Sequence, residues 1–280
     1  MTIGEVIRRS TDWLAGKGSD TPRLDAEVLV GHALGFERIR LYTEAERPLT
    51  PEEVAQCRAL IARRGDLVPV AHITGHRAFG RLDLEVTPDV LVPRPDTEVV
   101  VDVVVELAPP GAAVVDWGTG SGAIALSVAD LRPDVTVAGL ERSPAALAVA
   151  VRNLAAYPAL AGRVRLLASD GMAAVAGERF DVVVANPPYL VPGDLDRFPA
   201  LRHEPEPALV AGPLGTEDHR RVAAEAADVL RPGGLLILEV GEGQADAVDG
   251  ILVGAGFGGI AVRPDLAGIP RAVWGRMPPE

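Results

Sequence analysis

The first 75 residues show the spacing of apolar positions that is typical of amphipathic helices. Thr2 can cap the first helix, Pro22 suits a first helical turn, and Thr50-Pro51-Glu52-Glu53 is a strong helix start. The expected helices are Ile3–Ala15, Pro22–Leu34 and Val54–Arg64. We therefore predict that residues 1–75 form a small N-terminal helical bundle domain.

The pattern changes after residue 75. Between Ala78 and Val92 apolar and polar side chains alternate, as in Leu82, Leu84 and Val86 against their neighbours. Such alternation is typical of half-buried strands, and Thr87-Pro88-Asp89 has the composition of a turn. We predict a β-hairpin here, with residues 76–96 as the linker between two domains.

From Thr97 onward, valine-rich strands alternate with helices. The expected strands are Ala113–Asp116, Thr136–Glu141, Val164–Ala168, Phe180–Ala185, Leu235–Val240, Ile260–Arg263 and Arg271–Gly275, and the expected helices are Ala123–Leu131, Ser143–Asn153, His219–Leu230 and Ala245–Ala255. Alternation of this kind predicts an α/β domain over residues 97–280, with a doubly wound, mostly parallel sheet.

Composition narrows the classes of function. The formal net charge of the 280 residues is -12. Residues 1–75 carry 10 basic and 11 acidic side chains, whereas residues 76–280 carry 17 and 28, so the acidity lies in the α/β region. An acidic body disfavours broad contact with a phosphate backbone, and we expect no direct nucleic-acid binding.

Other features bear on location. No apolar run reaches the ~18 residues that a membrane helix needs, and the N-terminal residues lack a signal-peptide pattern. Cys57 is the only cysteine, so it forms no intrachain disulfide, and we expect it to be a small buried hydrophobe. These features predict a soluble, cytoplasmic protein without a membrane segment, and we expect a monomer.

A glycine-rich segment, Asp116-Trp117-Gly118-Thr119-Gly120-Ser121-Gly122, joins a predicted strand to a predicted helix. Glycines allow a tight turn and a close approach of backbone to ligand. The spacing alone also fits a dinucleotide-binding fingerprint. Asp116 favours a different ligand, because a carboxylate suits a sulfonium or ammonium group better than a pyrophosphate. The segment is therefore a candidate S-adenosylmethionine site formed by Asp116, Gly118, Thr119, Gly120, Ser121 and Gly122.

Carboxylates end the next two strands. Glu141 is placed to accept hydrogen bonds from both hydroxyls of a ribose, which suits NAD and S-adenosylmethionine equally. Asp170, in Ser169-Asp170-Gly171, either accepts from an adenine amino group or holds a turn, and the sequence leaves both open. We take Glu141, Asp170 and Gly171 as candidate cofactor-binding residues.

The segment Asn186-Pro187-Pro188-Tyr189 follows a buried strand, where open α/β folds bind their ligands. The prolines make this backbone stiff and leave its carbonyl groups as acceptors. The Asn186 side-chain oxygen and the Pro187 carbonyl can grip both hydrogens of one NH2 group, and Tyr189 can stack on the planar group that carries it. Asn186, Pro187 and Tyr189 are the candidate catalytic residues, and Pro188 completes the predicted substrate pocket.

These motifs resemble the HemK/PrmC family, the protein-(glutamine-N5) methyltransferases of bacterial peptide chain release factors. The further segments that carry the resemblance are Arg23–Glu27, Pro69–Gly75, Val92–Glu98, Glu204–Leu209, Arg231–Gly234 and Asp265–Gly268. Trp117 departs from the pattern, since the family usually has an aliphatic residue there, and Glu141 stands where aspartate is usual.

The resemblance implies transfer of a methyl group from S-adenosylmethionine to the side-chain amide of glutamine, at a Gly-Gly-Gln tripeptide of the release factor. It also implies that S-adenosylhomocysteine is the product, that Asn186 touches both cofactor and substrate, and that residues 1–75 help to recognise the release factor. No metal is required.

Two rival functions remain at this point. A nucleic-acid adenine-N6 methyltransferase uses a similar motif to hold an exocyclic amine after base flipping. The acidic body and the Pro93–Glu98 stretch disfavour it. A non-catalytic regulator or an NAD-dependent oxidoreductase with the same fold is the second rival. Asp116 and the intact Asn186–Tyr189 segment disfavour that alternative.

Overall fold

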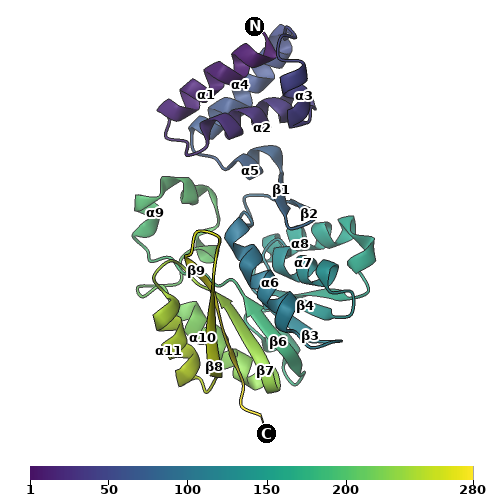
Figure 1. Cartoon of the computed structure of the whole chain (residues 1–280), viewed down its shortest axis with the longest axis vertical. Helices are drawn as coiled ribbons and strands as arrows, with labels where there is room; N and C mark the ends of the chain where they lie inside the picture. Colours follow the sequence, from purple (N-terminus) through teal and green to yellow (C-terminus); the bar gives the residue numbers. More distant parts are fainter. Residues whose placement is uncertain (280) are drawn as a thin grey trace. The chain divides into compact units, whose positions relative to one another are not determined.

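The computed structural model describes residues 1–279, and the chain divides into two compact units (Figure 1). The first unit comprises Met1–His76 together with Phe198–His203, a short piece of a distant loop. The second comprises Arg77–Arg197 and Glu204–Glu280. The chain therefore leaves the second unit once, after Arg197, and returns to it at Glu204.

The first unit is helical, as predicted. Its helices are α1 (Ile3–Gly16), α2 (Pro22–Leu34), α3 (Arg38–Thr43), α4 (Pro51–Gly65) and α5 (Val70–Thr74). Thr2 and Thr50 cap α1 and α4, and each forms a reciprocal pair of hydrogen bonds with the glutamate three residues later. The three predicted helices are confirmed; α3 and α5 are too short to show a periodic pattern and were not predicted.

Buried polar pairs accompany the apolar core of this unit. Asp25 accepts a hydrogen bond from Arg64 Nε at 2.6 Å, and Glu27 accepts from Arg38 Nη2 at 2.7 Å and from the Tyr42 hydroxyl at 2.7 Å. Cys57 is buried in the core, where burial raises the pKa of its thiol to about 11. The expectation that Cys57 behaves as a buried hydrophobe is confirmed.

The hairpin lies earlier in the chain than predicted. Its strands are β1 (His76–Phe79) and β2 (Leu82–Glu85), and the turn is at Gly80 and Arg81. Gly80 has a φ of 55°, a conformation that glycine adopts without strain. Thr87-Pro88-Asp89 does form a turn, with Val90 N donating to the Thr87 carbonyl, but it follows the hairpin. The prediction of strand structure up to Val92 was therefore wrong.

The second unit contains a seven-stranded sheet in the order β5-β4-β3-β6-β7-β9-β8. The strands are β3 (Ala113–Trp117), β4 (Thr136–Glu141), β5 (Val164–Ala168), β6 (Phe180–Ala185), β7 (Leu230–Glu239), β8 (Gly258–Pro264) and β9 (Pro270–Arg276). The pairs from β5 to β7 are parallel, whereas β9 runs antiparallel to β7 and β8. The predicted mostly parallel sheet is confirmed.

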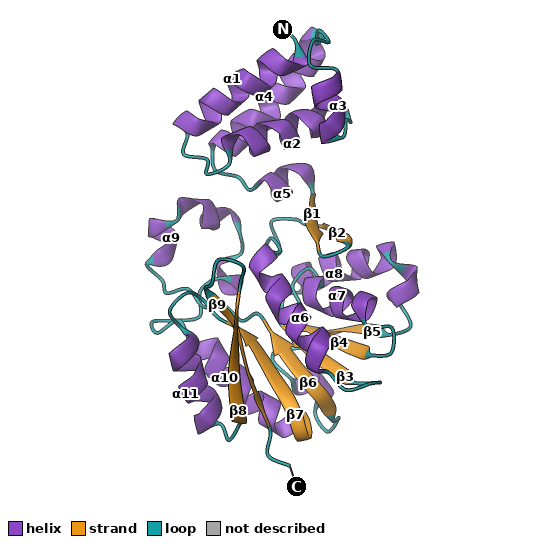
Figure 2. Ribbon diagram, viewed as in Figure 1, coloured by secondary structure: helices purple, strands orange, loops and turns teal. Residues whose placement is uncertain are grey.

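Helices cover both faces of this sheet (Figure 2). One face carries α6 (Glu98–Leu107), α7 (Ala123–Leu131) and α8 (Pro144–Ala156), and the other carries α10 (Glu217–Val229) and α11 (Ala245–Gly254). The valine-rich α6 was not predicted, although Val100, Val103 and Val104 are buried at helical spacing. A short helix, α9 (Asp194–Arg197), and five 3-10 turns, including Pro95–Thr97, complete the described structure.

The strand order determines where a ligand can bind. From β3 the chain moves outward to β4 and β5, and it then returns to place β6 on the other side of β3. Connections therefore diverge above the carboxyl ends of β3 and β6, which leaves a crevice at this switch point. Trp117 is paired with Ala185 across these two strands, so the glycine-rich segment and Asn186 begin side by side. Within residues 1–279, no helix is long and apolar enough to cross a membrane.

Candidate active site

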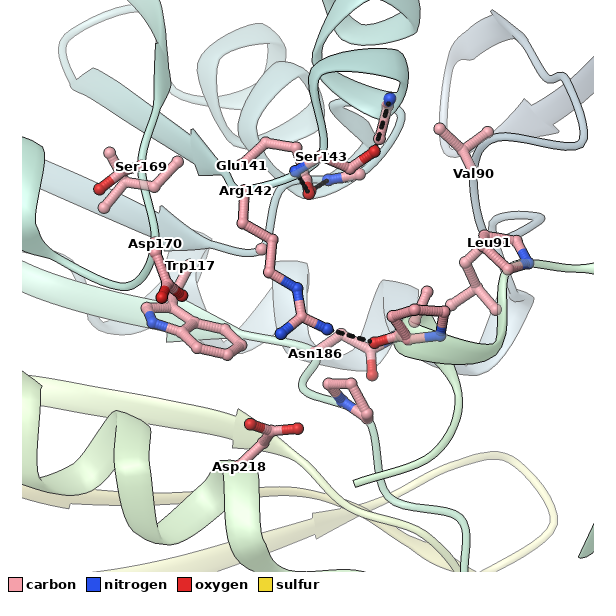
Figure 3. Close-up of a pocket in the computed structure, with 18 of the residues that line it drawn as sticks. Val90, Leu91, Trp117, Glu141, Arg142, Ser143, Ser169, Asp170, Asn186 and Asp218 are labelled. Carbon is pink, nitrogen blue, oxygen red and sulfur yellow. Dashed lines mark hydrogen bonds between the residues drawn. The ribbon is translucent and has the colours of Figure 1, made fainter. Parts of the chain in front are cut away.

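A pocket opens at the switch point, above the carboxyl ends of β3 to β6 (Figure 3). Its walls are formed by Asp89, Val90, Leu91, Trp117, Gly118, Gly120, Leu140, Glu141, Arg142, Ser143, Ala146, Ser169, Asp170, Gly171, Asn186, Pro188, Pro205, Pro207, Ala208 and Asp218. The structure thus brings together seven of the predicted site residues: Gly118, Gly120, Glu141, Asp170, Gly171, Asn186 and Pro188.

The glycine-rich loop forms one wall. Gly118, Gly120 and Gly122 have φ values of 71°, 55° and 86°, which other residues adopt only with strain. A side chain on Gly118 would meet no other atom within 4 Å, so the space above it is open. The loop thereby offers exposed backbone to a ligand. Thr119 is tied to β4, because its backbone N–H donates to the Leu140 carbonyl at 2.9 Å.

Asp116 lies behind this loop and does not line the pocket. Its side chain is fully buried, and its Oδ2 accepts from the Thr119 hydroxyl at 2.5 Å and from Ala125 N at 3.1 Å. Burial raises the pKa of this carboxyl to about 7. Asp116 therefore connects the loop to the first turn of α7, and a direct contact with a sulfonium group stays a prediction. Thr119, Ser121 and Gly122 likewise support the loop from outside the pocket wall.

Glu141, by contrast, faces the pocket from the end of β4. Its Oε2 accepts from Gly120 N at 2.9 Å, and its Oε1 accepts from Ser143 N at 2.8 Å. One carboxylate thus joins the glycine loop to the start of α8 (Figure 3). Each carboxylate oxygen accepts more than one hydrogen bond, so both retain capacity for ligand hydroxyls.

Trp117 and Asp170 lie together at one side of the pocket (Figure 3). The Trp117 indole N–H donates to Glu225 Oε2 at 3.1 Å, and this oxygen also accepts from Met172 N at 3.0 Å. Arg221 links Glu225 to Asp170, with Nη2 at 2.9 Å from Asp170 Oδ1. The indole in place of an aliphatic side chain is therefore satisfied by Glu225.

Gly171 lies against the same cluster. A side chain there would approach the Glu225 carboxylate within 2.5 Å, and the φ of Gly171 is 66°. Asp170 remains largely exposed, with 72% of its side-chain surface accessible. Its carboxylate is thus available on the pocket side, and whether it accepts from adenine stays a prediction.

The Asn186–Tyr189 segment forms the opposite wall. Asn186 Nδ2 donates to the Thr97 hydroxyl at 3.2 Å, which leaves its Oδ1 as the outward acceptor. Among described residues, no donor of the chain reaches that oxygen or the Pro187 carbonyl. The two acceptors proposed for an NH2 group are therefore both unused. Pro187 and Tyr189 do not line the pocket itself.

Tyr189 is fixed by its backbone. Its N–H donates to the Leu209 carbonyl at 3.2 Å, and its own carbonyl accepts from Gln244 Nε2 at 3.0 Å. The ring packs against Gly241, where an added side chain would approach it within 3.0 Å. Burial raises the pKa of the Tyr189 hydroxyl to about 12, so it stays protonated at neutral pH. It can stack or donate but does not act as a base.

Ion pairs connect three of the segments that carry the family resemblance. Glu204 is buried and binds both Val92 N, at 2.8 Å, and the Arg94 guanidinium. Arg271 binds Asp96 at 2.8 Å and Asp265 at 2.9 Å. These ion pairs thereby join three segments around the Asn186–Tyr189 wall: Val92–Glu98, Glu204–Leu209 and Asp265–Gly268.

Several pocket residues were not predicted from the sequence. Val90 and Leu91 contribute apolar surface opposite Trp117, and Arg142 Nη2 donates to the Pro207 carbonyl at 3.0 Å across the opening (Figure 3). Nothing in their sequence context distinguishes them. Glu239, which is buried and does not line the pocket, is different, because a single carboxylate in the apolar run Leu235–Val240 is a signal that could have been noticed.

Comparison with known proteins agrees with this geometry. Residues 5–75 match the PrmC N-terminal domain, and residues 96–198 match the methyltransferase small domain. The chain is 42% identical over 278 residues to the release factor glutamine methyltransferase of Geobacter sulfurreducens, covering 99% of this chain and 97% of that protein. It is 44% identical over 273 residues to the corresponding protein of Moorella thermoacetica, covering 96% and 95%.

A solved structure shows the same fold. The crystal structure of a methyltransferase from Pyrococcus furiosus aligns with a TM-score of 0.55 at 19% identity, covering 79% of this chain and 98% of that one. The predicted Rossmann-like methyltransferase fold and the predicted family are both confirmed. The chain belongs to the family of the release factor glutamine methyltransferases, which are S-adenosylmethionine-dependent enzymes.

Proposed function

We propose that this protein methylates the side-chain amide nitrogen of a glutamine in a peptide chain release factor, expected at its Gly-Gly-Gln tripeptide. The single observation that carries the proposal is the Asn186–Tyr189 wall. It presents two unused acceptors, Asn186 Oδ1 and the Pro187 carbonyl, beside a pocket at the position where such folds bind nucleosides. Two acceptors match the two hydrogens of a primary amide.

The residues of the other wall fit S-adenosylmethionine. Gly118 and Gly120 leave open space over their backbone, and Glu141 offers acceptor capacity for ribose hydroxyls. Asp170 and Trp117 border the side that suits the adenine. When bound, S-adenosylmethionine supplies an electrophilic methyl group on a positively charged sulfur and becomes S-adenosylhomocysteine. Asp116 supports this site from behind, through Thr119.

The protein itself orients the substrate amide and stabilises the charge that develops on it. An amide nitrogen is a weak nucleophile because its lone pair is delocalised into the carbonyl. Asn186 Oδ1 and the Pro187 carbonyl hold the nitrogen in one direction and stabilise the positive charge that develops on its N–H groups. The nitrogen gains one bond to carbon and releases one proton. Pro188 lines the pocket and helps to exclude water from it.

We further propose that residues 1–75 help to recognise the release factor. The support is topological: Phe198–His203, from the loop that follows Tyr189, packs with the N-terminal helices, and His203 Nε2 lies 2.9 Å from the Asp66 carbonyl. The loop that follows the substrate wall thus contributes Phe198–His203 to the first unit. A monomer acting in the cytoplasm is part of this proposal.

The experiment offers the protein tritiated S-adenosylmethionine with either a release factor or duplex DNA. Label is expected on the release factor, and mass mapping should place it on the glutamine of Gly-Gly-Gln. Label on DNA and none on the release factor would overturn the proposal in favour of an adenine-N6 methyltransferase. A release factor with Gln replaced by Glu at that position is the matched control, and it should stay unlabelled.

A further inference from the structure

Glu239 is a buried carboxylate next to the substrate wall that the mechanism above does not use. It is the last residue of β7, and the preceding Leu238 is paired with Ala185, the residue before Asn186. Glu239 is 1% exposed, and its Oε2 has no hydrogen-bond partner among the described residues. Burying a carboxylate oxygen without a hydrogen-bond partner costs free energy of folding, so we expect Glu239 to have a function.

A short chain of hydrogen bonds connects Glu239 to Asn186. The Thr97 hydroxyl oxygen accepts from Asn186 Nδ2 at 3.2 Å, and Thr97 also lowers the pKa of Glu239 by hydrogen bonding to its carboxylate. Thr97 is itself 4% exposed, so water does not compete for these bonds. Thr97 lies in the Val92–Glu98 segment, which is braced independently by the Arg94–Glu204 and Asp96–Arg271 pairs.

The direction of these bonds depends on Glu239. An ionised carboxylate only accepts hydrogen bonds, so the single Thr97 hydroxyl proton must go to it. The Thr97 oxygen is then an acceptor, and only the NH2 end of the Asn186 amide can bind it. Asn186 Oδ1 is thereby left toward the substrate. In the reversed orientation Asn186 would present its own NH2 group to the substrate NH2 group, with donor facing donor.

We infer that Glu239 is a positioning residue that acts through Thr97 to keep the Asn186 amide oxygen aimed at the substrate nitrogen. The inference rests on the proposed function and adds a residue that touches neither substrate nor cofactor. It explains why a carboxylate is retained in an otherwise apolar strand.

The surroundings of Glu239 make its charge sensitive to pH. Burial raises its pKa to about 7, with Thr97, Arg271 and Arg94 opposing this effect and Asp96 adding to it. Arg271 is already paired with Asp96 and Asp265, and Arg94 with Glu204. From α10, His219 Nε2 bonds to the Glu239 carbonyl, and burial lowers the His219 pKa. Tyr189 stays neutral. The Asn186 amide should therefore be held in this orientation when Glu239 ionises, as the pH rises through about 7.

Three variants test the inference kinetically. Glu239→Leu, which has no acceptor for Thr97, and Thr97→Val should each lower kcat by about 10- to 100-fold, with the Kd for S-adenosylmethionine changed by less than about threefold. Thr97→Ser, which keeps the hydroxyl, should stay within about threefold of the wild-type kcat. The double variant should be no worse than the poorer single variant, because both remove one chain of bonds. Asp181→Asn, at the far end of β6, is the matched carboxylate control and should keep the wild-type kcat.

A spectroscopic measurement is independent of the substrate. The chain contains two asparagines, Asn153 and Asn186, so selective 15N-asparagine labelling yields two side-chain NH2 signals. Asn153 Nδ2 binds the Glu85 and Ser121 carbonyls and serves as the internal reference. The Asn186 signal should titrate near pH 7 in the wild type and lose this titration in Glu239→Gln, while the Asn153 signal stays constant.

Two results would overturn the inference: wild-type kcat in Glu239→Leu, or an Asn186 signal that titrates identically with and without Glu239. These outcomes are separable from failure of the proposed function. If the wild type does not label the release factor but the Asn186 signal depends on Glu239, the hydrogen-bond chain stands and the substrate assignment falls.

Discussion

The two walls of the pocket are built in different ways. The glycine loop is held by carboxylates close to it in the chain: Asp116 is 3 residues from Thr119, and Glu141 is 21 residues from Gly120. The Asn186–Tyr189 wall is held by distant residues: Thr97 is 89 residues from Asn186, and Gln244 is 55 residues from Tyr189. One wall is a product of two neighbouring βα units, and the other depends on the assembled domain.

This difference has a functional consequence. A locally braced loop suits a ligand that binds in the same way in many enzymes of one fold. A wall braced from several segments is specific to the enzyme that has those segments. Here the bracing partners of the substrate wall are the segments that carry the family resemblance, Val92–Glu98 and Glu204–Leu209. Changes in the two walls should therefore affect different steps.

The largest effect is expected for Asn186→Ala. The variant loses the side-chain acceptor for the substrate amide, and the Pro187 carbonyl alone cannot orient an NH2 group. We expect kcat to fall by at least about 10³-fold, comparable to the loss of a preorganised transition-state contact. The Kd for S-adenosylmethionine should rise by less than about tenfold. Labelling of release factor and calorimetric titration of the cofactor measure the two quantities.

A kcat close to that of the wild type would refute the assignment of Asn186. The variant Asn153→Ala provides a contrast of the same chemical type, because Asn153 binds backbone groups of β2 and the glycine loop: it accepts from Glu85 N and donates to the Glu85 and Ser121 carbonyls. Loss of the Asn153 side chain should lower the free energy of unfolding and leave kcat less affected.

The second effect concerns the other wall. Glu141→Gln keeps an acceptor for one backbone N–H but loses the charge and one of the two acceptor sites that join Gly120 to Ser143. We expect the Kd for S-adenosylmethionine to rise by about 100-fold, whereas kcat at saturating cofactor should change by less than about threefold. Calorimetric titration and initial rates at high cofactor concentration measure this.

The exposed Glu178→Gln is the control, since its carboxylate pairs with Arg165 on the surface. A loss of kcat larger than the loss of cofactor affinity in Glu141→Gln would show that the two walls are not separable, and the comparison would fail.

A third variant tests the distant bracing. Glu204→Gln leaves Arg94 without its ion-pair partner but retains one acceptor for Val92 N. We expect kcat to fall by about tenfold and the free energy of unfolding by about 3 kcal/mol, the lower end for breaking a buried pair. Glu206→Gln, two residues further on and exposed, should match the wild type in urea unfolding and in rate. Unchanged stability of Glu204→Gln would contradict a bracing role.

The same difference between the walls decides what could be predicted from sequence. The strands and most helices of the α/β unit follow from apolar patterns, and the positions of Gly118, Glu141 and Asn186 follow from their places at strand ends. The site residues that depend on local sequence could therefore be predicted. The bracing of Asn186 by Thr97 was not, because no pattern pairs two residues that far apart in one sequence.

Two failures have specific causes. The hairpin was misplaced because Thr87-Pro88-Asp89 is a stronger turn signal than Gly80-Arg81, and both are turns in the structure. Asp116 was expected to face the ligand, since strand-end carboxylates often do. Its actual partners, Thr119 and Ala125, turn it inward, and only the three-dimensional position of α7 shows this.

The smallest effect on activity is expected for Asp116→Asn, whose main signature is in stability. A carboxyl with a folded-state pKa of about 7 holds its proton more tightly in the folded than in the unfolded chain. Its contribution to stability is fully present below pH 4 and is lost as pH rises to 7. Between these values the wild type should lose about 1.4 kcal/mol per pH unit relative to the variant.

Urea unfolding at several pH values measures this slope, and the exposed Asp228→Asn should keep the slope of the wild type. The offset between wild type and Asp116→Asn at any one pH also contains the cost of burying an amide, so the slope is the quantity that decides. Equal slopes would mean that Asp116 is ionised in the folded protein. The glycine loop would then rest on a charged brace, as the Asn186 wall does through Glu239, and the contrast between the two walls would reduce to the distance of their supports along the chain.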